Sequence, residues 1–217
     1  MSDPFAVSAE IETELRAIYA QYAALVAEGF DAERGLGGCL LWAGALDRES
    51  GRLARAASIA GAASLIATAD PAEGKHALRE GEADFLVTTL DEALRILKNE
   101  IRKRQPVAVC VLLTADAVRA EMLERGVLPD LLPAHSASED DAFVAQGARR
   151  ITPQPDCVLA VFRIPPALLP HSAGIDAPFR DALDADDEPG RRWLKLAASY
   201  LPTTMRRARR IAFSELV

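Results

Sequence analysis

The sequence predicts an α/β fold in which a doubly wound parallel sheet carries helices on both faces. Short apolar runs alternate with helical patterns from about residue 39 to residue 164, which is the arrangement of successive βαβ units. The stretch "VAVCVLLT" at 107–114 is continuously apolar, as expected of a strand buried on both faces of a parallel sheet. The chain has 217 residues, half of them hydrophobic, which is enough for one sizeable domain.

The first part of the chain is expected to begin with a helix. Ser8 can cap it, and apolar residues recur at helical spacing from Ile11 to Leu25 until Gly29 ends the pattern. The elements expected next are, in order, a strand at 39–43, a helix at 52–62, a strand at 63–69, a helix at 71–81 and a strand at 83–89.

The second part continues the alternation. An amphipathic helix is expected at 90–105, closed by Pro106, and a capping signal from Ser136 to Glu139 predicts a helix start. The other expected elements are a strand at 107–114, a helix at 115–126, a strand at 127–135, a helix at 136–150 and a sixth strand at 156–164. We therefore expect an N-terminal helix packing on the sheet (1–34), the α/β domain (35–165) and a C-terminal helical extension (166–217).

Charge and cysteine content narrow the class of protein. The net charge of −7 disfavours a general nucleic-acid binder, and no apolar run reaches the length that spans a bilayer. Cys39, Cys110 and Cys157 are odd in number, lie in apolar runs and form no C-x-x-C pair, so buried reduced thiols are expected and a zinc site is not. We expect a cytoplasmic protein without a metal.

The turn after the first strand is the first candidate site. Gly44 and Gly51 would permit a tight turn and let backbone N–H groups approach a phosphate, and Ser50 would cap the helix and contact the anion. Asp47 and Glu49 would place negative charge beside that anion, with Arg48 and Arg52 opposing them. The alternative is an ordinary turn in which Ser50 only caps a helix.

Two further groups of polar residues have alternative interpretations. Asp70 follows a strand about twenty residues after the turn, so it would accept hydrogen bonds from a ribose or would cap the helix that starts at Pro71. The stretch "HSASEDD" at 135–141 would bind a metal or act in acid–base chemistry, or its acids would favour a helix start.

The C-terminal region combines an acidic segment with a basic amphipathic one. The basic residues lie beside Trp193 and Tyr200 and are Arg191, Arg192, Lys195, Arg206, Arg207, Arg209 and Arg210. They would face RNA or an acidic partner, pair with the acidic segment, or contribute to a dimer contact. Apolar residues at 193, 194, 197, 200 and 201 indicate that this helix packs onto something.

Two long stretches of the sequence resemble a known family. The stretches "LREGEADFLVTTLDEAL" and "LLTADAVRAEMLERGVLPDLLPAHSASEDD" are similar to the NAD-binding Rossmann domain of urocanase (urocanate hydratase). The match is best at Gly81, Asp84, "LDEAL" at 90–94 and "ERGVLPD" at 124–130. The resemblance implies a Rossmann-like domain that holds NAD, which in urocanase adds as an electrophile to the imidazole of urocanate.

The sequence departs from the family pattern where the cofactor would bind. The glycine-rich turn of the family is replaced by "GALDRESGR", which keeps Gly44 and Gly51, and the acid near the ribose falls at Thr68, two residues before Asp70. The G-N-A turn of the family falls on residues 113–115, which places Thr114 there. Its T-D-Q-T-S-A-H-D-P stretch falls on "PAHSASEDD", with Ser136 in place of a threonine and Asp140 retained.

These observations lead to three hypotheses about function. In the first, the chain binds NAD, another nucleotide or a small anion through Gly44, Ser50, Gly51, Asp70, Thr114 and Ser136, without urocanase activity on its own. In the second, it is a cofactor-free structural or regulatory protein that forms a homo-oligomer or a subunit contact through the C-terminal helix. In the third, it is a small enzyme with a new site at the strand ends. An intact urocanase is not expected, because the turn is rewritten and the flanking substrate-binding segments find no match.

Overall fold

The computed structural model describes residues 8–134, 138–152, 160–163, 183–184, 186–202, 205 and 208–211. The helices within them are α1 (Ala9–Ala27), α2 (Arg48–Ala60), α3 (Pro71–Glu80), α4 (Leu90–Lys103), α5 (Ala115–Glu124), the 3₁₀ turn η1 (Ser138–Asp140), α6 (Asp141–Val144) and α8 (Glu188–Tyr200). The strands are β1 (Leu40–Ala45), β2 (Ala63–Ala67), β3 (Phe85–Val87), β4 (Val107–Val111), β5 (Leu131–Leu132), β6 (Arg149–Arg150), β7 (Ala160–Arg163) and β8 (Ala208–Ile211).

The central sheet is entirely parallel and has the order β3-β4-β2-β1-β5-β6. From β1 the chain adds β2 beside it, then β3 at the edge, and then β4 between β2 and β3. It then crosses to add β5 and β6 on the other side of β1. In an open parallel sheet, this reversal creates a crevice at the carboxyl ends of the two strands where it occurs. Here those strands are β1 and β5.

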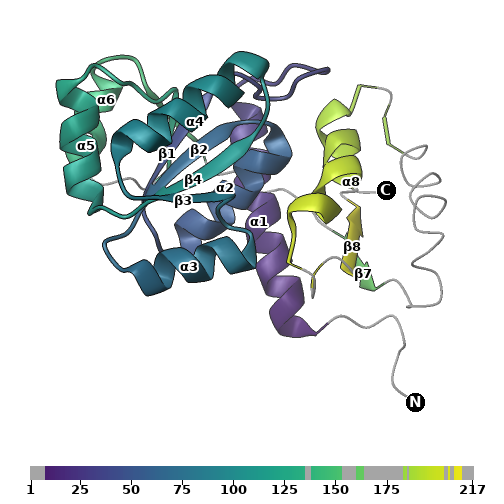
Figure 1. Ribbon diagram of the computed structural model, residues 1–217. Helices are drawn as coiled ribbons and strands as arrows, with labels where there is room; N and C mark the ends of the chain where they lie inside the picture. The colour runs from purple at the N-terminus through teal and green to yellow at the C-terminus, as the bar shows by residue number, and fades with distance from the viewer. Residues whose placement is uncertain are drawn as a thin grey trace.

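Both faces of the sheet are covered by helices, as Figure 1 shows. Alternate residues of β1 enter two hydrophobic clusters: Leu41 and Ala43 pack on the side of α1 and α2, and Leu40 and Trp42 on the side of α4 and α5. β1, β2 and β4 are buried on both faces, which explains why their sequences are apolar without alternation. The predicted doubly wound, Rossmann-like α/β fold is confirmed.

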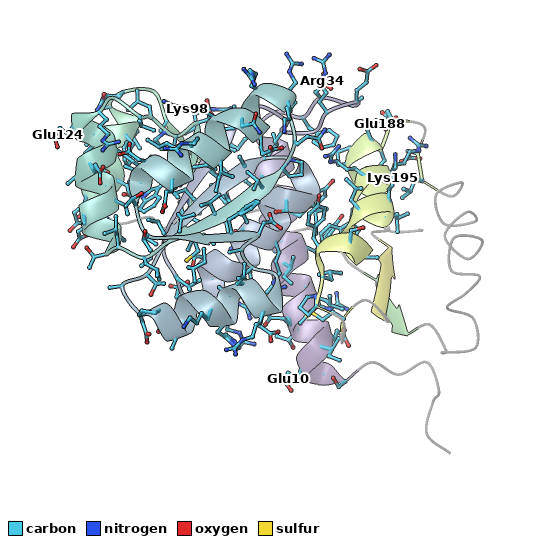
Figure 2. All side chains as sticks on the ribbon, in the orientation of Figure 1. Glu10, Arg34, Lys98, Glu124, Glu188 and Lys195 are labelled. Atoms are coloured by element: carbon cyan, nitrogen blue, oxygen red, sulfur yellow. The ribbon has the colours of Figure 1, made fainter. Side chains whose placement is uncertain are left out.

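Helix α8 lies beside α1 and α2, on the outside of the domain (Figure 1). Trp193 is buried there against Tyr19 and Tyr22, and the Tyr22 hydroxyl donates a hydrogen bond to the Pro189 carbonyl at 2.6 Å. Burial raises the pKa of Tyr22. The apolar face expected on this basic segment therefore packs on its own chain, while charged side chains such as Glu188 and Lys195 point outward (Figure 2).

Several expected elements differ from the structure. The helix expected at 52–62 begins earlier, at Arg48, because Asp47 rather than Ser50 is its N-cap. The strand expected at 156–164 is present as β7, but it does not join the central sheet and pairs antiparallel with β8 instead. The sixth strand of the central sheet is β6, which lies within the stretch expected to be helical. The two residues of β6 are too few to produce a strand pattern in the sequence. The apolar run that contains β7 indicates a strand but does not specify which strand it pairs with.

Candidate functional site

The crevice between β1 and β5 holds a pocket of about 490 Å³, within the range of small-molecule sites. We call it the switch-point pocket. Its wall consists of residues 43–45 at the end of β1, the first turns of α2 and α5, Pro133 and Ala134 after β5, and single residues from α1 and η1. The fold thus places a cavity where sheets of this topology bind ligands.

A β-bulge shapes the β1 side of the pocket. The register between β1 and β2 shifts between Trp42 and Gly44, so that Ala43 is the additional residue. Gly44 has a φ of +83°, and a Cβ built on it would meet nothing within 4 Å. The bulge requires a glycine for its backbone conformation, and it turns the end of β1 toward open space in the pocket.

The first turn of α2 is closed by its own residues. The Asp47 carboxylate accepts a hydrogen bond from the Ser50 backbone N–H at 2.8 Å, and the Ser50 hydroxyl accepts one from the Asp47 N–H at 2.8 Å. This capping box uses backbone donors that a phosphate would otherwise contact. The carboxylate also places a negative charge at the positive end of the helix.

The two arginines near the turn are already paired. Arg48 and Arg52 both contact Glu14 of α1, at 2.7 and 2.6 Å, and Arg52 also pairs with Glu49. The hydrogen bond from Arg52 lowers the pKa of Glu14 to about 2, against the effect of burial and with help from Arg48. These cations therefore join α1 to α2 rather than standing free to meet an anion.

The opposite wall of the pocket contains a hydrogen-bonded chain that runs from the buried Trp42 and Asp140 through Arg119 to the exposed Asp116. Arg119 donates from Nε to Asp140 Oδ1 at 2.8 Å and from Nη1 to Asp116 Oδ1 at 2.8 Å, and the Trp42 indole donates to the same Asp140 oxygen at 3.3 Å. Asp140 is only 3% exposed. Burial lowers the pKa of Arg119, but its bonds to the two carboxylates outweigh that effect and raise it, so the side chain remains a cation.

The structure brings only some of the predicted site residues together. Gly44 and Ser50 line the pocket. Thr114 caps α5 by accepting a bond from the Ala117 N–H at 3.2 Å, directly before the lining residues Ala115 and Asp116.

The other predicted residues lie elsewhere. Gly51 is inside α2, where a Cβ would come within 2.8 Å of the Glu82 carboxyl carbon, so it permits close packing. Asp70 caps α3 at 2.7 Å from the Ala72 N–H and is not part of the pocket lining. Ser136, with His135, lies outside the described residues.

Trp42 and Arg119 were not expected from the sequence. A buried tryptophan in an apolar strand carries no sign of a polar contact, and Arg119 looks like an exposed helix residue. The spacing of Asp116 and Arg119, three residues apart on a helix, is the one signal that pairs them. Their connection to Asp140 depends on tertiary structure.

Within the described residues, no group of three histidine, cysteine or acidic side chains is placed to hold a metal ion. Cys110 is buried and Cys39 half-buried, and burial raises the pKa of both thiols; Cys157 lies outside the described part of the chain. None of the described helices has both the length and the apolarity needed to cross a membrane.

The parallel sheet, its reversal at β1 and the pocket at that point define a Rossmann-like domain with a cavity at its topological switch point. A family model of the urocanase Rossmann-like domain matches residues 17–143, more than half of the chain. The protein belongs to this family. The match extends from within α1 to α6 and covers the pocket, so the resemblance of the sequence to urocanase is confirmed.

Proposed function

We propose that this protein binds a small molecule in the switch-point pocket and has no urocanase activity on its own. The observation that carries the proposal is the position of the pocket: it lies at the carboxyl ends of β1 and β5, where the strand order reverses, and the Gly44 bulge opens it. Ligand sites of open α/β sheets lie at this position.

NAD, the cofactor that the family resemblance suggests, fits this pocket poorly at its pyrophosphate. The N-terminus of α2, which would receive the phosphates, is capped by Asp47, and the Ser50 hydroxyl is bonded within the capping box. The arginines that would offset these charges are paired with Glu14 and Glu49. The residues present therefore favour a ligand other than a dinucleotide, and NAD is included in the screen below to test this.

The closed N-terminus of α2 also favours a second candidate function: a cofactor-free protein that acts through a partner. In that case the capping box and the Glu14 ion pairs would have replaced the ligand and fixed α2 to α1. A contact through α8 is the partner surface that the sequence suggests, but the buried face of that helix already packs on α1 and α2.

A thermal-shift screen of the purified protein tests the proposal. The library contains NAD, NADH, NADP, ATP and urocanate together with small cationic and neutral compounds. A ligand at about one hundred times its Kd adds about 2.7 kcal/mol, a shift of roughly 5–10 °C for a chain of this size. We expect at least one compound to shift the Tm.

A pocket-blocking variant locates the binding. Ala45→Trp fills the pocket from an exposed position at the end of β1, and Ala72→Trp makes the same change at an exposed position outside it. Ala45→Trp should abolish the shift, and Ala72→Trp should keep it. If no compound shifts the wild-type Tm, or if Ala45→Trp leaves the shift unchanged, the proposed function is wrong and the partner hypothesis gains support.

A further inference from the structure

The charges that line the switch-point pocket are mainly negative. The described acids in the lining are Asp47, Glu49, Asp116 and Asp140, and the described cation in the lining is Arg119. Arg119 is itself held by Asp140 and Asp116. A phosphate in this pocket would face carboxylates at close range, where the repulsion between like charges is strongest.

The buried Asp140 is the group best placed to receive a ligand. Its Oδ1 accepts both the Trp42 and the Arg119 hydrogen bonds, while Oδ2 has no bond to any described residue. The side chain is 4% exposed and belongs to the pocket lining. An ionised carboxylate oxygen that faces a pocket can accept a further hydrogen bond, and a protonated amine supplies the donor together with a positive charge.

The remaining lining suits an apolar body. Ala43, Leu53 and Ala115 contribute aliphatic surface on three sides of the pocket, and Pro133 and Ala134 cover the β5 side. Pockets that bind small molecules combine such apolar walls with few polar groups that fix the orientation.

Resting on the proposed small-molecule function, we infer that the switch-point pocket selects a compact organic cation, a protonated amine or amidine with an apolar body, over any phosphate-bearing ligand. The ammonium or amidinium group lies against Asp140, and Asp47 and Asp116 at the rim add long-range attraction. The position that receives phosphate in dinucleotide-binding folds is here the acidic part of the pocket.

Three probes of nearly equal shape and different charge test this inference: phenethylamine, its neutral isostere 2-phenylethanol, and the anion phenylacetate. Their Kd values are measured by NMR titration of the full chain at low and at physiological salt, with NAD and pyrophosphate measured in parallel. We expect phenethylamine to bind at least about fivefold more tightly than 2-phenylethanol, with a preference that shrinks as salt rises. Phenylacetate, NAD and pyrophosphate should bind more weakly than either.

Two variants with a matched control assign the preference to the pocket. Asp116→Asn removes an acid that is the second residue of its helix and pairs with an arginine, and Asp91→Asn makes the same change at the equivalent place in α4, outside the pocket. Asp47→Ser removes a second rim charge and retains an N-cap residue. The preference for the amine should fall about two- to threefold in Asp116→Asn and in Asp47→Ser, and should be unchanged in Asp91→Asn.

Other results overturn the inference in distinguishable ways. The charge selection is contradicted by equal binding of the amine and the alcohol, by tighter binding of phenylacetate or NAD, or by an equal loss of preference in Asp91→Asn. In each of these cases the proposed function still holds if Ala45→Trp abolishes the binding. If none of the probes binds at millimolar concentration, the inference is wrong. The proposed function fails with it only if the wider thermal-shift library is also negative.

Discussion

Asp47 is the residue that changes the character of the turn. From the sequence, Ser50 is expected as the N-cap and Asp47 only as a negative charge, although both residue types accept hydrogen bonds from free helix N–H groups. In the structure Asp47 is the N-cap of a capping box, because the Ser50 hydroxyl, three residues later, accepts a hydrogen bond from the Asp47 N–H. The sequence shows that the turn carries acids, but only the structure shows that one of them closes the helix end.

The burial of Asp140 leads us to predict a large effect of its substitution on the free energy of unfolding. Asp140→Asn keeps the shape of the side chain but removes the charge that balances Arg119, so the free energy of unfolding should fall by about 1–3 kcal/mol. Asp141→Asn alters the next acid, whose side chain is 71% exposed, and should cost less than about 0.5 kcal/mol. Urea unfolding of the two variants gives the comparison, and equal losses would refute the buried pairing.

The ion pairs of Glu14 predict how the stability of the protein depends on pH. Its pKa is lowered from 4.5 to about 2 in the folded protein, first by Arg52, so the folded state favours the ionised form. The stabilisation is complete above about pH 4.5 and is lost as pH falls toward 2. Glu14→Gln should therefore lower the Tm at neutral pH, and the difference from wild type should narrow between these pH values. A difference independent of pH would contradict the ion pairs.

At the level of helices and strands, α8 is attached to the C-terminal end of α2 through Arg192. Arg192 donates from Nε to the Ile59 carbonyl at 2.8 Å, and a Cβ built on Gly61 would lie 2.6 Å from its Nη2. Burial lowers the pKa of Arg192. The guanidinium thus binds a carbonyl at the negative end of α2, a favourable position for a cation.

A pair of glycine substitutions measures this attachment. Gly61→Ala and Gly81→Ala both place a side chain at a helix C-cap with positive φ, but only Gly61 has groups of α8 within contact distance. Gly81→Ala should cost about 1 kcal/mol through backbone strain, and Gly61→Ala at least about 1 kcal/mol more because Arg192 and Arg34 crowd the new methyl group. Chemical denaturation checks the difference, and equal costs would argue against the contact.

Some helices and strands could be predicted from the sequence and others could not, and the difference has physical reasons. α4 was predicted because its apolar stripe and its closing Pro106 are local signals; Leu90, Ala93, Leu94 and Leu97 are buried as expected. β6 was missed because its two residues are strand only by pairing with β5. The helix expected at 136–150 is represented in the described residues by the short η1 and α6, since Gly147 and the start of β6 end it early.

At the scale of the whole molecule, the sheet order creates the site and the local sequence decides its chemistry. The alternation of strands and helices predicts a parallel sheet, whereas the reversal at β1 is seen in the strand order of the structure, and the pocket lies at that reversal. The linkage of Trp42, Arg119 and Asp140 could not be predicted, because it joins three segments whose proximity depends on the complete fold. Family membership therefore fixes the fold that forms the pocket, while the residues of this chain decide which groups line it.

The two tryptophans allow the most direct measurement of the central claim. The chain has two tryptophans, and their indole N–H signals separate the pocket from the rest of the molecule. Trp42 donates to Asp140 at the pocket, while Trp193 of α8 packs against Tyr19 and Tyr22 of α1. A ¹H–¹⁵N spectrum is recorded during titration with phenethylamine, and Trp193→Phe assigns the signals. We predict a saturable shift of the Trp42 indole signal with the Trp193 signal unchanged. A Trp42 signal that stays fixed while the amine binds, or that moves only with NAD, would contradict the account.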